Sequence, residues 1–387
     1  MTGTNRELSV PRWTDVLSGL QERHTGMWVG LGNLESRILS ERLEGVPIEK
    51  PVYIAGLARS GTTILLELLS RHPRLASHRY RDFPPVLTPW FWNWFVDRAG
   101  TSDEAASERA HGDGIEVTPE SPEAFEEVIW MAFFPNLHDP EVSSVLAADA
   151  ANKEFENFYR DHIRKLLLLR GGRRYLCKAN YNLTRLGYLL KLFPDARFLL
   201  PIRDPVWHIA SLMRQHERFC GEHRRDDRLR RHMSRAGHFE FGLDRRPINS
   251  GDPQVTREVR ELWAKGNEVE GWALYWTDLH GRVAEQLERD DALRQATMMV
   301  DYEALCREPG SVMTKVLTHC DLPANGIENG IDLVAEAKRI VRPPTYYRPA
   351  FSDGQVALIE RVTSPVKRRF DAFTRFEAPQ DVGLKRP

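Results

Sequence analysis

A short apolar run, a glycine-bounded loop and a helix are predicted one after another at residues 51–71. Residues 51–55 (PVYIA) have the composition of a buried strand, and residues 62–71 are predicted to be helical. The loop between them begins at Gly56 and ends at Gly61. Backbone N–H groups and the positive end of the helix dipole meet at such a junction. The sequence therefore predicts an anion-binding loop here.

The two glycines have the spacing of a P-loop, G-x-x-x-x-G-K-[ST], but Thr62 stands where that motif has its lysine. A P-loop enzyme needs the lysine to hold the β- and γ-phosphates of a nucleoside triphosphate. The loop is therefore better suited to a less highly charged anion, with Arg59 as its cation. The alternative interpretation is a glycine turn that binds nothing.

Further apolar runs alternate with helical segments, and they lie at residues 174–178, 196–202 and 297–300. Helices are predicted near residues 122–134, at 183–193 and over 256–290. This alternation predicts βαβ units and a parallel sheet, with the carboxyl ends of the strands along one edge. We expect a helical N-terminal arm at residues 1–50 and one domain at residues 51–387. An insertion rich in Pro and Trp is expected within that domain, at about residues 80–150.

A second anion site is predicted where the run at 196–202 ends. Arg203 comes directly after this strand, Asp204 is placed to cap the next helix, and Pro205 suits its first position. Ser211 lies eight residues after Arg203, about two turns into that helix. An arginine and a hydroxyl in these places can bind a phosphate. The alternative is an Arg–Asp pair on the surface of a capped helix.

Together the two motifs resemble those of sulfotransferases that use 3′-phosphoadenosine 5′-phosphosulfate (PAPS). The first corresponds to the family's phosphosulfate loop, [PK]-x-[ST]-G-T-T, with Arg59 where hormone and phenol sulfotransferases carry lysine. The second corresponds to the family's Arg and Ser eight residues apart. Residues 176–199 and 300–309 are also similar to tyrosylprotein sulfotransferases and their bacterial relatives.

The resemblance implies a P-loop-like three-layer α/β/α sandwich with a central parallel sheet and a helical, aromatic insertion. It implies an enzyme that transfers a sulfuryl group from PAPS, without a metal, to a hydroxyl or amine by in-line displacement. Tyr302 would lie near the adenine or the 3′-phosphate, and a loop at residues 342–348 is a candidate cover for the donor. The implied donor-binding residues are Arg59, Ser60, Gly61, Thr62, Thr63, Arg203, Ser211 and Tyr302.

Three residues are the predicted catalytic groups. Arg59 is placed to stabilise the leaving phosphate oxygen, and Lys178 matches a lysine that tyrosylprotein sulfotransferases hold near the transferred group. A hydroxyl acceptor also needs a general base, for which Asp82 is the predicted residue and His78 and His111 are the alternatives. For Lys178 and for the three candidate bases, an ordinary structural role is the competing interpretation.

The composition of the chain limits the classes of partner that it is expected to bind. The net charge of −1 argues against bulk electrostatic binding to nucleic acid or an anionic membrane, though not against a local basic site. Four widely spaced cysteines and the lack of a signal-peptide or membrane-spanning run favour the cytoplasm. We expect a small-molecule, lipid or carbohydrate acceptor, and a homodimer is allowed for.

Two other functions fit parts of the sequence. A P-loop kinase-like phosphotransferase would use ATP and magnesium, and a binding module would hold a nucleotide or sulfate without catalysis. The aromatic residues of 90–95 and 130–134 are predicted to be core packing, with an apolar acceptor site as the alternative. The arginine-rich segment 214–246 is predicted to be a solvated face with internal ion pairs, or else an entry for the anionic donor.

Overall fold

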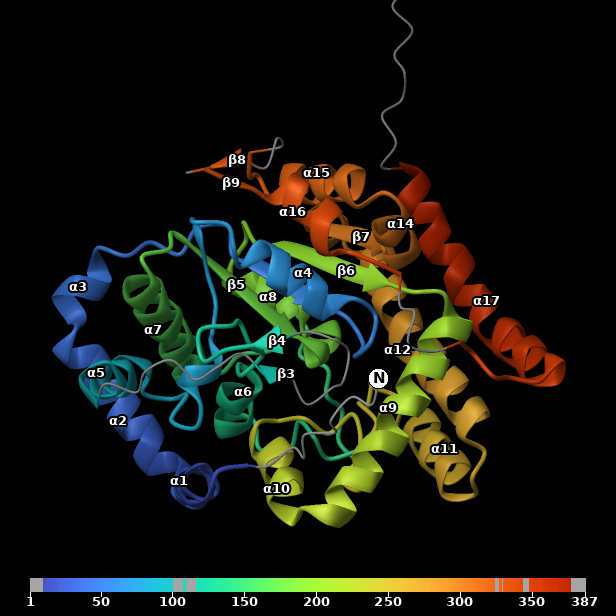
Figure 1. Ribbon diagram of the computed structural model, residues 1–387, viewed down its shortest axis with the longest axis horizontal. Helices are drawn as coiled ribbons and strands as arrows, with labels where there is room; N and C mark the ends of the chain where they lie inside the picture. The colour runs from blue at the N-terminus through green and yellow to red at the C-terminus, as the bar shows by residue number, and fades with distance from the viewer. Residues whose placement is uncertain are drawn as a thin grey trace, which may run out of the picture.

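A five-stranded parallel sheet lies at the centre of the computed structural model, which describes residues 10–99, 107–108, 116–323, 327–328, 330–343 and 348–376 (Figure 1). The strand order is β2–β5–β1–β6–β7, and every neighbouring pair is parallel. The strands are β1 (Val52–Ala55), β2 (Leu75–Ala76), β5 (Arg174–Ala179), β6 (Arg197–Ile202) and β7 (Thr297–Asp301). The predicted parallel sheet is confirmed, and β2 is an edge strand that the sequence analysis did not predict.

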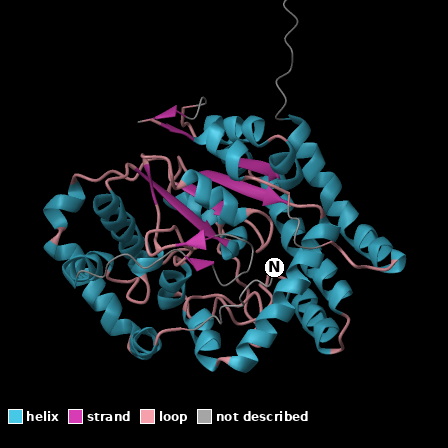
Figure 2. Ribbon diagram, in the orientation of Figure 1, coloured by secondary structure: helices cyan, strands magenta, loops and turns pink. Residues whose placement is uncertain are grey.

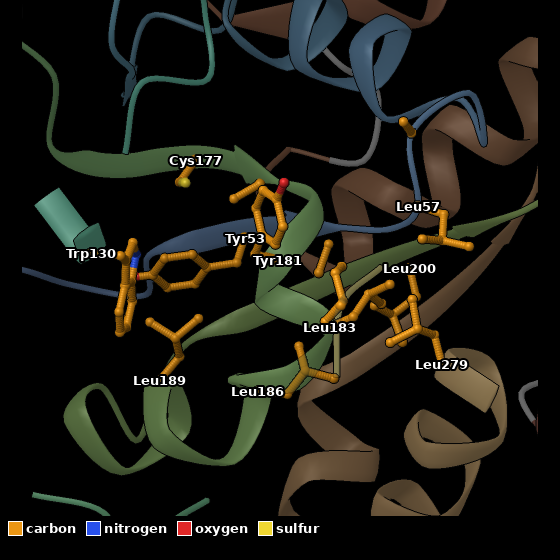
Figure 3. Packing of buried hydrophobic residues seen from close by; sticks show 14 of the residues in the cluster. Tyr53, Leu57, Trp130, Cys177, Tyr181, Leu183, Leu186, Leu189, Leu200 and Leu279 are labelled. Atoms are coloured by element: carbon orange, nitrogen blue, oxygen red, sulfur yellow. The ribbon is translucent and has the colours of Figure 1, made fainter. Parts of the chain in front are cut away.

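Each strand contributes side chains to two separate cores, because successive residues of a strand point to opposite faces. Val52 and Ile54 pack under one layer of helices. Tyr53 and Leu200 pack under the other (Figure 3). The first layer is α4 (Thr62–Leu69), α14 (Tyr302–Arg307), α15 (Pro309–His319) and α16 (Leu333–Ile340). The second includes α7 (Lys153–Arg170), α8 (Leu186–Leu192), α9 (Pro205–Arg225), α12 (Glu268–Arg289), α13 (Asp291–Ala296) and α17 (Asp353–Phe376). The three-layer α/β/α sandwich is therefore confirmed (Figure 2).

The predicted N-terminal helices are present as α1 (Arg12–Arg23), α2 (Thr25–Ile38) and α3 (Ser40–Glu44). A buried ion pair holds α2 on α7, because Lys165 Nζ lies 2.9 Å from Glu35 Oε2. The same ammonium donates a hydrogen bond of 2.7 Å to the Gly32 carbonyl. Substitution of Gly32 is restricted as well, since an added Cβ would lie 2.5 Å from the Leu87 carbonyl oxygen.

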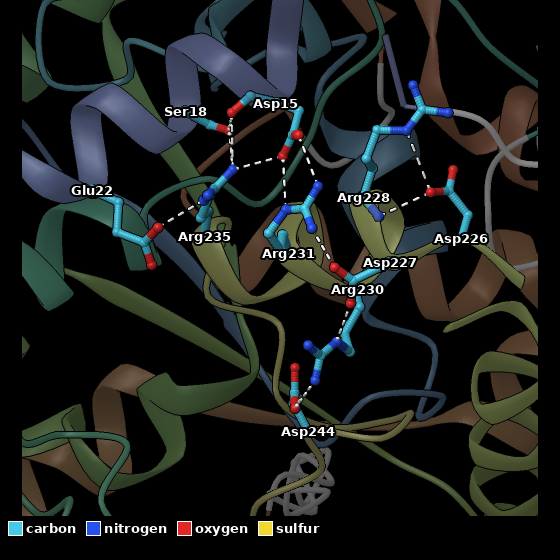
Figure 4. A network of polar contacts seen from close by, with 10 residues as sticks. All are labelled: Asp15, Ser18, Glu22, Asp226, Asp227, Arg228, Arg230, Arg231, Arg235 and Asp244. Carbon is cyan, nitrogen blue, oxygen red and sulfur yellow. Dashed lines mark hydrogen bonds and ion pairs between the residues drawn. The ribbon is translucent and has the colours of Figure 1, made fainter. Parts of the chain in front are cut away.

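Arginines of α10 (Asp227–Arg235) hold α1 (Figure 4). Arg231 and Arg235 both contact the Asp15 carboxylate, at 2.9 and 2.8 Å. Arg235 also contacts Glu22 at 2.8 Å. Much of the arginine-rich segment thus forms ion pairs within the protein, which was the first of its two predicted roles.

Three helical predictions differ from the structure. The predicted helix near residues 122–134 is only α6 (Glu127–Phe133), and the pattern at 183–193 begins as a 3₁₀ turn (Asn180–Thr184) before α8. The pattern at 256–290 is two helices, α11 (Pro253–Ala264) and α12, which separate at Gly266 with φ 80°. This bend folds Trp263 back onto Trp272, with ring centroids 4.7 Å apart. Packing of two large aromatic rings thus overrides a continuous helical pattern.

The remaining elements lie around the sheet. They are a 3₁₀ turn (Tyr80–Asp82), α5 (Pro89–Ala99), β3 (Ser107–Glu108), β4 (Glu116–Val117), β8 (Ile327–Glu328) and β9 (Ile331–Asp332). Pairs β3–β4 and β8–β9 are antiparallel ribbons outside the main sheet.

Candidate functional site

The loop after β1 has a shape that depends on Gly61. Arg59 has φ 72° and Gly61 has φ 106°, so both lie in the left-handed region. A Cβ added to Gly61 would lie 2.6 Å from Cδ2 of Tyr302, which leaves no room for a side chain. Ser60 closes the loop, since its Oγ donates a hydrogen bond of 2.8 Å to the Leu57 carbonyl. The hydroxyl of Ser60 therefore shapes the loop from inside.

The loop leads into α4, whose first residues are Thr62 and Thr63. Thr62 is buried and Thr63 is half-buried. The first N–H groups of an α-helix have no partner within the helix. The predicted strand–loop–helix junction is therefore present, with backbone donors gathered at residues 61–63.

The second junction joins β6 to α9. The Asp204 carboxylate accepts hydrogen bonds from the backbone N–H groups of Val206 and Trp207, at 3.1 and 3.3 Å. Pro205 occupies the first helical position, as predicted. Arg203, at the end of β6, and Ser211, on α9, are both buried. The cap thus fixes the start of the helix that carries Ser211.

The two junctions contact one another. Nε of Arg59 donates a hydrogen bond to Oγ of Ser211 at 3.3 Å. Nη1 of Arg203 donates to the carbonyl oxygen of Arg59 at 3.2 Å. The Arg203 guanidinium also lies 4.8 Å from the ring centroid of Tyr302. The structure therefore brings together Arg59, Gly61, Arg203, Ser211 and Tyr302 at the carboxyl edge of the sheet.

His208 supports this arrangement, although the sequence analysis did not identify it. Trp276 Nε1 donates a hydrogen bond of 3.1 Å to His208 Nδ1, so the imidazole proton is on Nε2. That nitrogen lies 2.9 Å from the Ala58 carbonyl and donates to it. Burial lowers the pKa of His208 well below its usual value, which keeps the ring neutral. His208 thus ties the anion loop to α9 and α12.

Lys178 lies near the end of β5 and is buried. It is paired in the sheet with Ile54, two residues before Gly56, so it lies at the same edge as the loop. A group of polar side chains follows. Asn180 Nδ2 donates a hydrogen bond of 2.6 Å to Glu240, and His238 Nδ1 lies 3.8 Å from the same carboxylate. Sequence analysis identified Lys178 but neither His238 nor Glu240, because these two lie in a loop without a motif.

The charge state of Glu240 follows from its neighbours. Burial raises the pKa of the Glu240 carboxyl, but contacts with His238 and Asn180 and the charge of Lys178 more than offset this. The pKa of Glu240 is therefore below its usual value, and the carboxylate is ionised. A carboxylate next to His238 can orient that imidazole and stabilise it when it gains a proton.

Asp82, the predicted base, has a different environment. Its carboxylate has no exposed surface, and it contacts Arg170 at 2.5 Å and Asn93 at 3.0 Å. Burial raises its pKa, but His78 and Arg170 reverse this and hold the pKa of Asp82 well below its usual value. A carboxylate that is buried and hard to protonate is poorly suited to accept a proton from an acceptor. The geometry favours a structural role for Asp82.

Only one of the two alternative bases lies within the described residues. His78 is buried, and its ring stacks on His162 with centroids 5.0 Å apart. His111 lies outside the described residues.

The predicted cover for the donor, at residues 342–348, is described only in part, because residues 344–347 lie outside the described residues. Arg342 donates hydrogen bonds to the carbonyls of Lys338 and Val341.

Comparisons with known proteins agree with this geometry. A model of the Sulfotransferase family matches residues 51–245, half of the chain, and this span includes both junctions and the Lys178 group. The omega-hydroxy-beta-dihydromenaquinone-9 sulfotransferase Stf3 of Mycobacterium bovis is 26% identical over 341 residues, covering 80% of this chain and 77% of that protein. Its Mycobacterium tuberculosis counterpart matches to the same extent.

Two solved structures are also similar. Sulfotransferase STF9 from Mycobacterium avium aligns with a TM-score of 0.47 at 16% identity, over 87% of this chain and 81% of that one. Sulfotransferase STF1 from Mycobacterium tuberculosis aligns with a TM-score of 0.45 at 15% identity, over 95% and 88%. The family match, which spans half of the sequence and both contacting junctions, shows that this chain belongs to the sulfotransferase family and is a sulfuryl-transferring enzyme.

Proposed function

We propose that the sulfuryl donor is PAPS, held between the two junctions. The observation that supports this most directly is the contact between them, from Arg203 Nη1 to the Arg59 carbonyl and from Arg59 Nε to Ser211 Oγ. An adenosine bisphosphate carries an anionic group at each end of the nucleoside. Two cationic sites at adjoining strand ends match that distribution of charge.

The chemistry of the residues fits such a donor better than a nucleoside triphosphate. The phosphosulfate would meet Arg59 and the backbone donors at Gly61, Thr62 and Thr63, and the 3′-phosphate would meet Arg203 and Ser211. Tyr302 offers an aromatic ring beside Gly61, where an added Cβ would be excluded. Thr62 occupies the place of the lysine that triphosphate chemistry requires.

The protein's part in the reaction is to position two substrates and stabilise charge. PAPS supplies a sulfuryl group whose departure leaves negative charge on a phosphate oxygen. Arg59 and the N-terminal end of α4 would stabilise this charge, and Lys178 is a second cation at the same edge. Preorganised donors of this kind need no rearrangement during the reaction.

For the acceptor, we propose an apolar, lipid-like molecule with a hydroxyl group. The relative from Mycobacterium bovis is named for an omega-hydroxylated dihydromenaquinone, which combines these two features. His238 is the proposed base. It lies beside ionised Glu240 in the group that includes Lys178, and its side chain is 24% exposed. A half-buried imidazole beside a carboxylate can accept the proton of an acceptor hydroxyl.

The donor assignment is tested by ligand-induced stabilisation. We expect 3′-phosphoadenosine 5′-phosphate to raise the melting temperature of the wild-type protein, since a ligand at 100 times its Kd adds about 2.7 kcal/mol. Arg203→Ala removes a charged hydrogen-bond donor, which is worth about 1.5–3 kcal/mol, and should weaken binding by about 10–150-fold. Differential scanning fluorimetry across a ligand titration measures both effects.

Arg257→Ala is the matched control, because Arg257 is exposed and lies 3.7 Å from Glu141 in a surface ion pair. It should leave the ligand-induced shift unchanged. Stabilisation by ATP with magnesium, and none by the bisphosphate, would contradict the assignment and support the kinase alternative.

The base assignment is tested by comparing two variants. His238→Ala should lower kcat by about 10²–10⁴-fold, the usual contribution of a general base, without reducing binding of the bisphosphate. Asp82→Asn should lower the melting temperature, since it leaves the buried Arg170 without its charge partner. Its kcat per folded molecule should stay near that of the wild type. The measurement is release of the bisphosphate from PAPS with a hydroxylated polyisoprenoid acceptor.

The opposite pattern would show that the base is Asp82. In that case His238→Ala would retain full kcat, and Asp82→Asn would lose activity while remaining folded. His238→Gln serves as a second variant, because glutamine keeps a polar side chain of similar length but cannot act as a base near neutral pH.

A further inference from the structure

Helix α1 has its polar side toward the protein and its apolar side toward the outside. Thr14, Ser18 and Gln21 are buried, whereas Trp13 and Val16 are 55% and 63% exposed. A surface helix ordinarily buries its apolar face. The reversal is fixed by the ion pairs from α10, which hold the polar side of α1 inward (Figure 4). An apolar face is therefore left that no described part of the chain covers.

This face continues onto two further helices. Helix α1 contacts α2, and α2 contacts α5. Trp13 of α1 lies 6.3 Å from Trp92 of α5, and the Trp92 ring stacks on Phe95 at 5.8 Å. Eight of the ten exposed large apolar side chains in the described chain lie on these three helices. We call them the arm surface: Trp13, Val16, Leu20, Met27, Leu34, Ile38, Trp94 and Phe95. Such clustering is characteristic of a contact site.

The acids of α1 and α2 form ion pairs within the protein. Asp15 and Glu22 pair with arginines of α10, and Glu35 pairs with Lys165. The three arginines of the same helices are exposed, and no described acid pairs with them; they are Arg12, Arg23 and Arg37. The outer side of the two helices is therefore apolar and cationic, although the whole chain has a net charge of −1.

We propose that the arm surface docks on an anionic lipid bilayer, with α1, α2 and α5 lying at its interface. Helices with an apolar face and flanking arginines bind in this way, and Trp is enriched at the boundary between lipid and water. The Arg98 guanidinium lies 4.0 Å from the centroid of the Trp94 ring. The Trp94 ring can therefore enter the lipid–water interface while the charge of Arg98 stays beside it. No described helix is long and apolar enough to cross a bilayer.

Charge favours a bilayer over a second copy of this chain. Pairing of two arm surfaces across a two-fold axis would bring arginines toward arginines, while the acids that could offset them are already used inside each subunit. The cores of protein–protein interfaces are depleted of charged residues. Anionic head groups supply the opposite charge in excess. Docking by the arm surface requires neither the proposed donor nor the proposed acceptor.

The test uses the full chain and flotation with vesicles of phosphatidylcholine alone or mixed in equal parts with phosphatidylglycerol. The wild type should float with the anionic vesicles, and high salt should weaken this binding. The triple variant Trp13→Ser, Leu20→Ser, Ile38→Ser should bind more than about tenfold more weakly. Its matched control is Val142→Ser, Leu243→Ser, which removes the two exposed apolar side chains outside the arm surface and should bind as the wild type does.

A second variant keeps the test decisive if the serine substitutions disturb folding. Arg12→Gln, Arg23→Gln, Arg37→Gln changes only exposed side chains, and it should weaken binding to anionic vesicles by more than about tenfold, because each arginine adds to the attraction by anionic head groups. Absence of wild-type flotation would overturn the proposal, as would equal flotation of wild type and both variants. A wild-type dimer that the serine variant dissociates, with no vesicle binding, would identify a second copy as the occupant.

Discussion

Arg59→Ala is expected to lower kcat for sulfuryl transfer by about 10²–10³-fold, the usual effect of removing one preorganised donor to a developing oxyanion. Arg59 contacts both halves of the site, through its side chain to Ser211 and through its carbonyl to Arg203. The substitution removes the cation but keeps the backbone carbonyl that Arg203 uses. The loss should therefore fall mainly on kcat, because the negative charge that Arg59 would stabilise is greater in the transition state than in the bound donor.

Three variants isolate the charge of Arg59. Arg59→Lys should retain much of the activity, since it keeps a cation at this position. Arg59→Gly removes the cation and fits the backbone φ of 72°, so a loss equal to that of the alanine variant would exclude backbone strain as the cause. Arg257→Ala should match the wild type. A kcat for Arg59→Ala within a few-fold of the wild type would contradict the role.

Local signals made the two junctions predictable from the sequence. The Asp204 cap, the proline after it and the glycine at 61 act within a few residues of their own position. The apolar runs at 51–55 and 196–202 predict strands wherever they lie in the chain, and adjacent strands of one parallel sheet must end at the same edge. The contact between Arg59 and Ser211 therefore follows from the parallel sheet that the sequence pattern predicts.

Contacts between distant segments could not be predicted in this way. His208 reaches Trp276 across 68 positions, and Asn180 reaches Glu240 across 60. Neither pair has a spacing that distinguishes it from many other polar pairs. The sequence offers Asp82 as the predicted base, yet folding buries it beside Arg170 on α7. Burial also divides the aromatic cluster, since Trp130 is in the core as predicted and Trp94 is exposed.

The loop that carries His238 packs against a second buried ion pair. Gly237 has φ 82°, and a Cβ there would lie 2.5 Å from Cγ of Glu127, so the turn before His238 rests on that side chain. Glu127 in turn accepts hydrogen bonds of 2.7 and 2.8 Å from Arg185. His138 lies 2.8 Å from the same carboxylate. The position of the proposed base therefore depends on an ion pair far from it in sequence.

Glu127→Gln is expected to reduce the free energy of unfolding by about 3–5 kcal/mol, because it leaves Arg185 buried without its counter-charge. Burial raises the pKa of Glu127, but Arg185 and His138 overcome this and lower it to about 2, from an ordinary value of 4.5. Since the folded pKa is depressed, the stabilisation is complete above about pH 4.5 and is lost as the pH falls toward 2. Urea denaturation midpoints at pH 7 and at lower pH measure both effects.

The pH dependence distinguishes the loss of a charge from a loss of packing. Glutamine and a protonated glutamic acid present similar neutral groups to Arg185, so the difference between wild type and variant should shrink as the pH falls below 4.5. Glu141→Gln, which breaks only exposed pairs with Arg257 and Arg260, should cost at most about 1 kcal/mol. A Glu127→Gln shift no larger than this, or one that stays constant with pH, would mean that the buried pair does not hold this region together by charge.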